Sequence, residues 1–282
     1  MPDTLRLSLT VPDDGSREPL VAELADLGFD AFEDDPDGLV AYAPAARWDD
    51  VARETVRRLL RARGATAADM HEEIVEDRDW NAEWEAGLEP VEAGPFVIAP
   101  SWAEEVPEWA GRHVLRIDPK MAFGTGYHES TRLVLRLLPD VAPSEGSVLD
   151  VGTGTGVLAI AALALGSERA IGVDIDPWSL ANARENALLN RVSTQLDVRE
   201  GSLDVVPESG FDLILANIIR AVLEPMLPDL VARANPGAPI ILAGLLVTER
   251  EHMLVVAAAA GLSLVSEASE NEWWACSLRA DG

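Results

Sequence analysis

The chain has 282 residues, and 48% of them are hydrophobic, which is enough for a packed core and excludes a disordered protein. Its formal net charge is −27, so its surface repels phosphates and direct binding to DNA or RNA is not expected. The excess of acid attracts a basic partner or reflects adaptation to high internal salt, and these two explanations are compatible.

Cysteine usage favours a reducing compartment, and the hydropathy pattern bears on whether the chain is secreted or enters a membrane. Cys276 is the single cysteine, so an intrachain disulfide is impossible. The N-terminus alternates polar and apolar residues and lacks the basic-then-apolar pattern of a secretion signal. The sequence contains no uncharged apolar run of the roughly 18–20 residues that span a bilayer. We therefore expect a cytoplasmic protein that does not enter a membrane.

Residues 1–78 are predicted to form a small domain of their own. The patterns predict a strand, a helix, two strands, a second helix and a last strand, over Thr4–Val11, Arg17–Leu27, Phe29–Glu33, Leu39–Ala43, Trp48–Arg63 and His71–Asp77. The order βαββαβ is typical of a ferredoxin-like α+β domain. Because it holds nothing that resembles a catalytic constellation, we expect this domain to recognise a partner.

Residues 79–90 are predicted to form a linker helix. Trp80 and Trp84 lie four residues apart and share a helix face, which favours packing against a neighbouring domain. Prolines then break the chain as far as Pro119, and short strands are predicted at Phe96–Ala99 and His113–Ile117.

A glycine-containing loop follows, from Pro119 to Arg132, and runs into a helix predicted over Glu129–Leu138. Thr131 lies near the start of this helix, where hydroxyl groups commonly act as caps. Alternatively, the loop closes over a cofactor and Thr131 helps to bind it. His128 could act as a base, although a lone histidine more often has a structural role.

The segment from Ser147 to Asp176 carries the strongest functional signal. A strand pattern ends in three alternating glycines, Gly152, Gly154 and Gly156, and a helix, a second strand and Asp174 follow. Glycines let a ligand approach the backbone, and the helix start offers unpaired N–H groups. An acid at the end of the second strand is placed to accept hydrogen bonds from a ribose. The segment predicts a nucleoside cofactor, with NAD still possible and a ligand-free turn as the alternative.

Strands and helices alternate over the rest of the chain. Helices are predicted over Pro177–Asn190, over Ile219–Ala234 with interruptions at Pro225 and Pro228, and over Thr248–Ala260. Strands are predicted over Gln195–Glu200, Phe211–Ala216, Ala238–Leu246, Gly261–Ala268 and Glu272–Leu278, where the last two could pair as a hairpin through Ser269–Asn271. This alternation predicts an α/β domain with a parallel, doubly wound sheet.

Several of these motifs resemble those of class I S-adenosylmethionine-dependent methyltransferases. The run DVGTGTG, from Asp150 to Gly156, resembles the first motif of that class, and DIDP from Asp174 resembles the second. The run ANI around Asn217 resembles the strand-end asparagine motif of amino-group methyltransferases. It lacks the Asn-Pro-Pro-Tyr of glutamine and adenine N-methyltransferases, which argues against those substrates.

The loop before the predicted helix is more specific. The run MAFGTG from Met121, followed by His128 and Thr131, resembles the PrmA family, which methylates the large-subunit ribosomal protein L11. Glu272-Trp273 also fits that family. The loop departs from the usual family pattern where Tyr127 and Glu129-Ser130 replace Thr, Pro and Thr. Thr131 keeps its hydroxyl, so its cofactor contact is expected to survive, while the shape of the substrate entrance is expected to differ.

The resemblance implies an α/β fold with a seven-stranded Rossmann-like methyltransferase domain (91–282), preceded by a ferredoxin-like substrate-recognition domain (1–78) and a linker helix (79–90). It implies a monomer with S-adenosylmethionine as cofactor, no metal, and basic ribosomal protein L11 as partner. The methyl acceptors are lysine side chains, the N-terminal α-amine, or both. The implied cofactor-binding residues are Phe123, Thr131, Gly152, Gly154, Asp174 and Asn217.

Asn217 is also the implied catalytic residue. With neighbouring backbone carbonyls it is expected to hold the hydrogens of a neutral amine and to aim the lone pair of the nitrogen, without a dedicated side-chain base. Three alternatives stay open at this point. The first is a methyltransferase that acts on another protein, on a small amine or on a nucleic acid. The second is a nicotinamide-dependent dehydrogenase. The third is a non-catalytic binding module that keeps the cofactor fold.

Overall fold

The computed structural model describes residues 3–11, 17–35, 38–66, 69–75, 87–120 and 122–280. The chain divides into two compact units, Met1–Trp80 (the first unit) and Asn81–Gly282 (the second unit). Most of the linker helix predicted over residues 79–90 lies outside the described residues, and residues 87–90 are not helical. Trp80, Trp84 and Met121 also lie outside the described residues.

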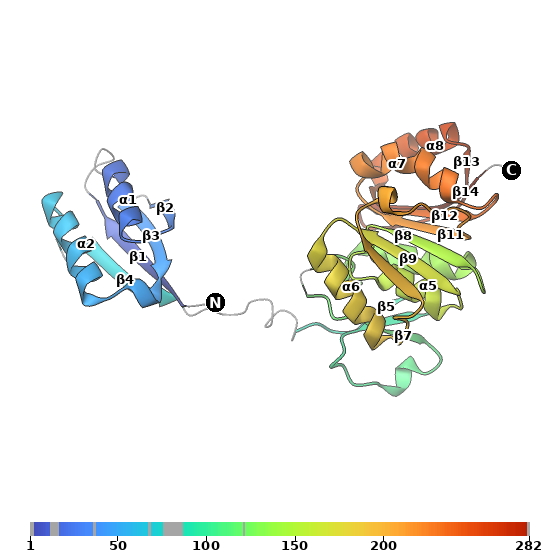
Figure 1. Ribbon diagram of the computed structural model, residues 1–282, viewed down its shortest axis with the longest axis horizontal. Helices are drawn as coiled ribbons and strands as arrows, with labels where there is room; N and C mark the ends of the chain where they lie inside the picture. The colour runs from blue at the N-terminus through green and yellow to red at the C-terminus, as the bar shows by residue number, and fades with distance from the viewer. Residues whose placement is uncertain are drawn as a thin grey trace. The chain divides into compact units, whose positions relative to one another are not determined.

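The first unit is a four-stranded antiparallel sheet with two helices (Figure 1). Its strands lie in the order β2-β3-β1-β4, and the order of elements along the chain is the one predicted. The elements are β1 Thr4–Thr10, α1 Arg17–Asp26, β2 Ala31–Asp35, β3 Gly38–Pro44, α2 Asp50–Ala62 and β4 Met70–Val75.

Alternation in β1 decides which face of this sheet the helices cover. Leu5, Leu7 and Leu9 are buried and pack with apolar residues of both helices, so α1 and α2 lie on the same face. The helix α2 begins after Asp49, whose carboxylate accepts a hydrogen bond from the Ala52 N–H at 2.8 Å. The first unit therefore has a core of its own.

The second unit contains a three-stranded and a seven-stranded sheet (Figure 1). The small sheet has the order β5-β6-β7, with β5 Val91–Ala93, β6 Phe96–Ala99 and β7 His113–Arg116. The large sheet has the order β10-β9-β8-β11-β12-β14-β13, with β8 Ser147–Val151, β9 Arg169–Asp174, β10 Leu196–Glu200, β11 Leu213–Asn217, β12 Pro239–Leu246, β13 Leu262–Glu270 and β14 Trp273–Ala280. Its helices are α4 Glu129–Leu137, α5 Val157–Ala164, α6 Pro177–Leu189, α7 Arg220–Arg233 and α8 Arg250–Ala259.

The large sheet is mixed, so the prediction of a parallel sheet is wrong for β14, which runs opposite to the other six strands. The first five strands in this order, from β10 to β12, are parallel to one another, but β14 pairs antiparallel with both β12 and β13. The cause is the short connection at Asn271–Glu272, because a parallel neighbour needs a crossover of a dozen or more residues. The predicted hairpin is confirmed, although Ser269 and Glu270 belong to β13 and not to the turn.

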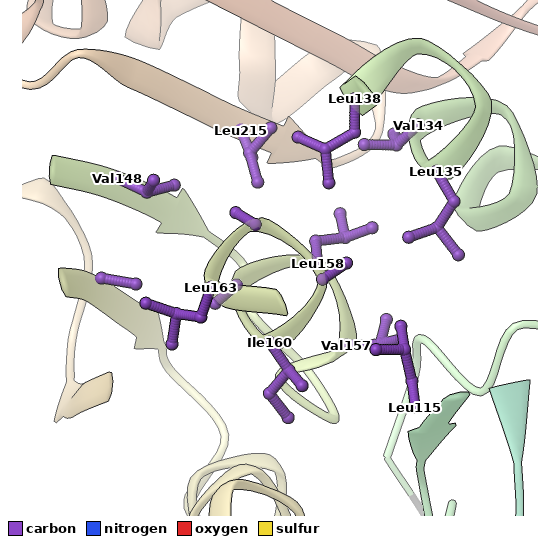
Figure 2. Close-up of a cluster of buried hydrophobic side chains, with 14 of the residues drawn as sticks. Leu115, Val134, Leu135, Leu138, Val148, Val157, Leu158, Ile160, Leu163 and Leu215 are labelled. Carbon is purple, nitrogen blue, oxygen red and sulfur yellow. The ribbon is translucent and has the colours of Figure 1, made fainter. Parts of the chain in front are cut away.

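Helices cover both faces of the large sheet. Val148 packs with residues of α4, α5 and α6, whereas its neighbour Leu149 packs with residues of α7 and α8. The helix α5 is buried almost all round. Its Leu158 points toward the side chains of α4, and its Val157 lies beside Leu115 of β7 (Figure 2). This packing fixes the start of α5 and the glycine turn that precedes it.

The helix α7 continues through both of its prolines, so the predicted interruptions are wrong. Leu223, Leu227 and Leu230 lie on its inner side and are fully buried. Pro225 and Pro228 lie on the exposed side, where water can satisfy the carbonyl groups that lose their helical partners. Burial of three leucines, at about 1.5–3 kcal/mol each, helps to offset the cost of about 3 kcal/mol for each proline.

Two further properties follow from the described residues. None of the helices in this part of the chain is long and apolar enough to cross a membrane. Cys276 is buried in β14, and the loss of hydration raises the pKa of its thiol to about 12. Because the thiolate is the reactive form, this cysteine is a packing residue and not a nucleophile.

Candidate active site

Three parallel strands end at one edge of the large sheet and carry predicted site residues. The strand β8 leads into the turn with Gly152 and Gly154, β9 ends at Asp174, and β11 ends at Asn217. With Phe123 from the loop before α4, these residues line one cavity of about 270 Å³, here called the first cavity. The structure therefore brings together five of the six residues predicted to bind the cofactor.

The glycine turn presents backbone to the first cavity. Gly152, Gly154 and Gly156 have φ angles of 71°, 53° and 82°, a region that residues with side chains rarely adopt. A Cβ atom on Gly154 would lie 2.3 Å from the carbonyl oxygen of Phe123. The turn and the loop can approach each other only because this residue has no side chain.

Thr155 joins the turn to the loop of residues 122–128. Its backbone N–H donates to the Phe123 carbonyl at 2.8 Å, and its hydroxyl donates to the Gly124 carbonyl at 2.7 Å. Just before the loop, Lys120 has a φ of 45° and forms an ion pair with Glu185 of α6. The Phe123 end of the loop is therefore fixed to the cavity that it borders.

Asp174 closes the glycine turn from the side of β9. One carboxylate oxygen accepts a hydrogen bond from the Gly154 N–H at 2.9 Å, and the other accepts one from the Asp176 N–H at 3.0 Å. A carboxylate can accept about four hydrogen bonds. Both oxygens therefore keep the capacity to accept from hydroxyl groups of a ligand in the first cavity.

Asn217 has a buried acceptor without a partner. Its Nδ2 donates to the Thr131 hydroxyl at 3.4 Å, whereas its Oδ1 is buried and accepts no hydrogen bond within the part of the chain that the structure describes. Such an acceptor is costly unless a ligand donor meets it. Thr131 is fully buried, and it contacts Asn217, which in turn lines the cavity.

The cap of α4 is His128, so the alternative that made Thr131 a cap is wrong. The Nδ1 of His128 accepts from the Ser130 N–H at 3.2 Å, because the backbone is still extended at His128, one residue before the helix begins. The imidazole ring lies 5.0 Å from the ring of Phe123 and 4.5 Å from that of Trp273, measured between centroids. His128 is therefore a structural residue with a hydrogen bond and two aromatic neighbours.

A second cavity of about 290 Å³ adjoins the first and shares Phe123, Asn217 and Ile218 with it. The rest of its lining is His128, Ser130, Ile219, Gly244 and Trp273. Aromatic and aliphatic groups dominate these walls, and such walls favour the uncharged form of a group that enters.

The second cavity contains residues that the sequence did not single out. They are Ile219 and Gly244, whereas Ser130 and Ile218 were named only as parts of the loop and strand-end motifs. Gly244 lies inside β12 with a φ of 78°, and a Cβ atom there would lie 2.8 Å from the Ile218 carbonyl oxygen. A glycine inside a strand pattern signals a close backbone approach, and this signal could have found it.

Asp150 lies in β8, two residues before the glycine turn begins, and is completely buried. Its Oδ2 accepts from the Thr153 hydroxyl at 2.7 Å and from the Ala159 N–H at 3.3 Å, while its Oδ1 has no partner among the described residues. Burial, with a smaller contribution from the charge of Asp174, raises the pKa of Asp150 to about 6 despite these hydrogen bonds.

The arrangement suits a nucleoside cofactor that carries an amino-acid group. Asp174 offers acceptors for ribose hydroxyls, and the glycine turn offers close backbone approach. The Oδ1 of Asn217 accepts no hydrogen bond among the described residues and borders both cavities, so its two lone pairs can accept one N–H from the cofactor and another from a group in the second cavity. These groups fit S-adenosylmethionine. Fold and site together define a class I S-adenosylmethionine-dependent methyltransferase.

Comparisons with known proteins identify the family. A family model described as ribosomal protein L11 methyltransferase (PrmA) matches residues 37–281. A ribosomal protein L11 methyltransferase of Chlorobaculum parvum is 36% identical over 257 residues, which cover 90% of this chain and 89% of that protein. One of Geobacter sulfurreducens is 42% identical over 211 residues, which cover 74% of this chain and 69% of that protein. The chain belongs to the ribosomal protein L11 methyltransferase family.

A solved structure agrees with this assignment. The ribosomal protein L11 methylase of Lactobacillus delbrueckii subsp. bulgaricus is similar to this chain with a TM-score of 0.64 and 27% sequence identity. The match covers 69% of this chain and 100% of that one. Family membership confirms S-adenosylmethionine as the cofactor and decides against the nicotinamide-dependent dehydrogenase.

Gly154→Ala is expected to weaken cofactor binding strongly. The added methyl group meets the Phe123 carbonyl at 2.3 Å, so the loop and the turn must separate. We expect affinity for S-adenosylhomocysteine, measured by calorimetry, to fall at least a hundredfold, about 2.7 kcal/mol. Gly166→Ala is the matched control, because Gly166 also has a positive φ, of 109°, but has open space around its Cβ position. Equal losses in both variants would contradict the prediction.

Asp150→Asn is expected to change how stability depends on pH. Burial raises the pKa of Asp150 from 3.8 to about 6, so the folded state keeps a proton that the unfolded state loses. The free energy of unfolding should therefore fall by roughly 3 kcal/mol between about pH 4 and pH 6 through this group. The asparagine removes the ionisation. Urea titrations should measure the free energy of unfolding of the wild type minus that of the variant. This difference should fall between about pH 4 and pH 6 and stay constant above pH 6. A pH-independent difference would mean that Asp150 ionises normally.

Proposed function

We propose that the protein transfers methyl groups from S-adenosylmethionine to amino groups of ribosomal protein L11. The acceptors are lysine side chains, the N-terminal α-amine, or both. Relatives that carry the name of this activity support the choice of substrate. The observation that carries the proposal is the unpaired Oδ1 of Asn217 where the two cavities meet. An amine that enters the second cavity meets an acceptor beside the cofactor cavity.

The cofactor occupies the first cavity in this proposal. Gly152 and Gly154 allow it to approach the backbone, Asp174 accepts from its ribose hydroxyls, and Phe123 covers it. Thr131 acts through Asn217, whose amide it orients. When bound, S-adenosylmethionine supplies a sulfonium methyl group that a nitrogen lone pair can take up by in-line displacement.

The protein must present the amine without its proton. A lysine amine has a pKa of about 10.4 and is mostly protonated at neutral pH. The apolar and aromatic walls of the second cavity disfavour the charged form, and Asn217 Oδ1 accepts from an N–H of the neutral form. His128 is not assigned as a base, because its Nδ1 is engaged with Ser130. The proton is lost to water before the amine enters.

The remaining parts of the chain serve recognition. The first unit, with the element order of a ferredoxin-like domain, corresponds to a substrate-recognition domain over residues 1–78. Residues 79–90 link it to the methyltransferase domain over residues 91–282. The net charge of −27 complements a basic ribosomal protein and opposes direct contact with nucleic acid. The protein acts as a monomer in the cytoplasm.

Asn217→Ala tests the assigned catalytic residue. Without the amide the amine loses its acceptor, and turnover should fall by about a hundredfold or more, as for other positioned polar groups at reacting centres. The measurement is transfer of labelled methyl groups to purified ribosomal protein L11. Asn235→Ala is the control, because Asn235 donates to Asp212 at 2.8 Å in the loop before β12, away from both cavities. Unchanged turnover in Asn217→Ala would exclude the role.

A chain shortened to begin at Gly87, which keeps Glu89 and every residue of the second unit that the structure describes, tests the recognition role. The second unit has its own core, so the shortened chain should bind S-adenosylhomocysteine with the affinity of the full chain. It should methylate ribosomal protein L11 at least tenfold more slowly, because the docking surface is gone. Calorimetry and labelled-methyl transfer measure the two properties. Full methylation by the shortened chain would remove the recognition role from the first unit.

A further inference from the structure

The loop of residues 122–128 is held at two ends by different groups. At the Phe123 end, Thr155 fixes the loop to the glycine turn through the Phe123 and Gly124 carbonyls. At the other end, Tyr127 and His128 lead into α4. The two ends differ in the cavities that they border, because Phe123 lines both cavities whereas His128 lines only the second.

Tyr127 anchors the His128 end on one side. Its hydroxyl donates a hydrogen bond to the backbone carbonyl of Glu89, two residues before β5 begins. The side chain is half-buried, and this burial, with the charge of Glu89, raises the pKa of the phenol above its ordinary value. The hydroxyl therefore stays protonated and remains a donor at neutral pH.

Other groups hold the same end on the opposite side. The Arg132 guanidinium donates to the Tyr127 carbonyl and forms an ion pair with Glu270 at the end of β13. Glu129 accepts from the Asn271 side chain at 2.9 Å. The hairpin that carries Glu270 and Asn271 continues into Trp273, which packs on His128. The aromatic wall of the second cavity is thus held between this hairpin and the Glu89 segment.

We propose that Tyr127 is a positioning residue, which fixes the His128 side of the second cavity by tying the loop to the segment where the chain enters the second unit. Residues 87–90 connect directly to the stretch that leads from the first unit, so the position of that segment sets the shape of the second cavity. The proposal rests on the proposed function only in taking the second cavity to receive the amine.

Tyr127→Phe tests this role because it removes the hydroxyl and keeps the ring. Loss of one neutral hydrogen bond costs about 1 kcal/mol, which changes the equilibrium constant between the anchored and the released conformation of the loop about fivefold. We expect kcat/KM for ribosomal protein L11 to fall about fivefold, while affinity for S-adenosylhomocysteine stays within twofold. Thr155→Val, which releases the Phe123 end, should give the reverse pattern, with cofactor affinity falling first.

Ser167→Ala is the matched control in the second unit. Its hydroxyl donates to the Pro143 carbonyl at 3.1 Å, a bond of the same kind before β9, at the edge of the sheet opposite both cavities. It should leave kcat/KM and cofactor affinity unchanged. If Tyr127→Phe instead lowers cofactor affinity in parallel with kcat/KM, or lowers neither, Tyr127 does not position the second cavity.

Hydrogen exchange gives a readout that does not depend on the substrate. In Tyr127→Phe, exchange should rise together in peptides covering residues 87–91 and 124–128 and stay unchanged in β8 and β9. Failure of the wild-type chain to methylate ribosomal protein L11 would contradict the proposed function but leave this test intact. Unchanged exchange in both peptides would overturn the coupling.

Discussion

The contact between the glycine turn and the loop before α4 is the constraint on which the site depends. At Gly154 the two backbones approach so closely that no side chain fits, and Thr155 holds them together with two hydrogen bonds. The turn is fixed because α5 behind it is buried on nearly all sides and cannot shift (Figure 2). The loop is therefore fixed to the packed core through the glycine turn, and it holds Phe123 between the two cavities.

The sheet supplies the rest of the site by its topology. The parallel strands β8, β9 and β11 end at one edge, so residues far apart in the sequence meet there. Asp174 and Asn217 face the same space although 43 positions separate them in the numbering. The hairpin of β13 and β14 adds Trp273 from the last part of the chain. Both cavities join distant segments, but the first is lined mostly by strand ends that carry recognisable local motifs, whereas the second is not.

This difference explains what could be predicted from the sequence. The glycine turn and the acid at the end of β9 are local patterns, and their positions at the first cavity follow from strand, turn and helix signals alone. The second cavity combines His128, Gly244 and Trp273, which no local pattern connects. The cap at His128 and the continuous helix α7 were also missed, because aromatic packing and leucine burial override the propensities of serine, threonine and proline. The antiparallel position of β14 depends on a turn only two residues long.

The choice of basic residues has a consequence for an enzyme that acts on amines. Lys120 is the single lysine among the 22 lysine and arginine residues, and the guanidinium of arginine stays protonated and offers no nucleophilic lone pair at physiological pH. Lys120 itself is engaged with Glu185. The chain thus presents a single ε-amine of its own, already paired with a carboxylate, so methylation of its own lysine side chain hardly competes with the intended acceptor.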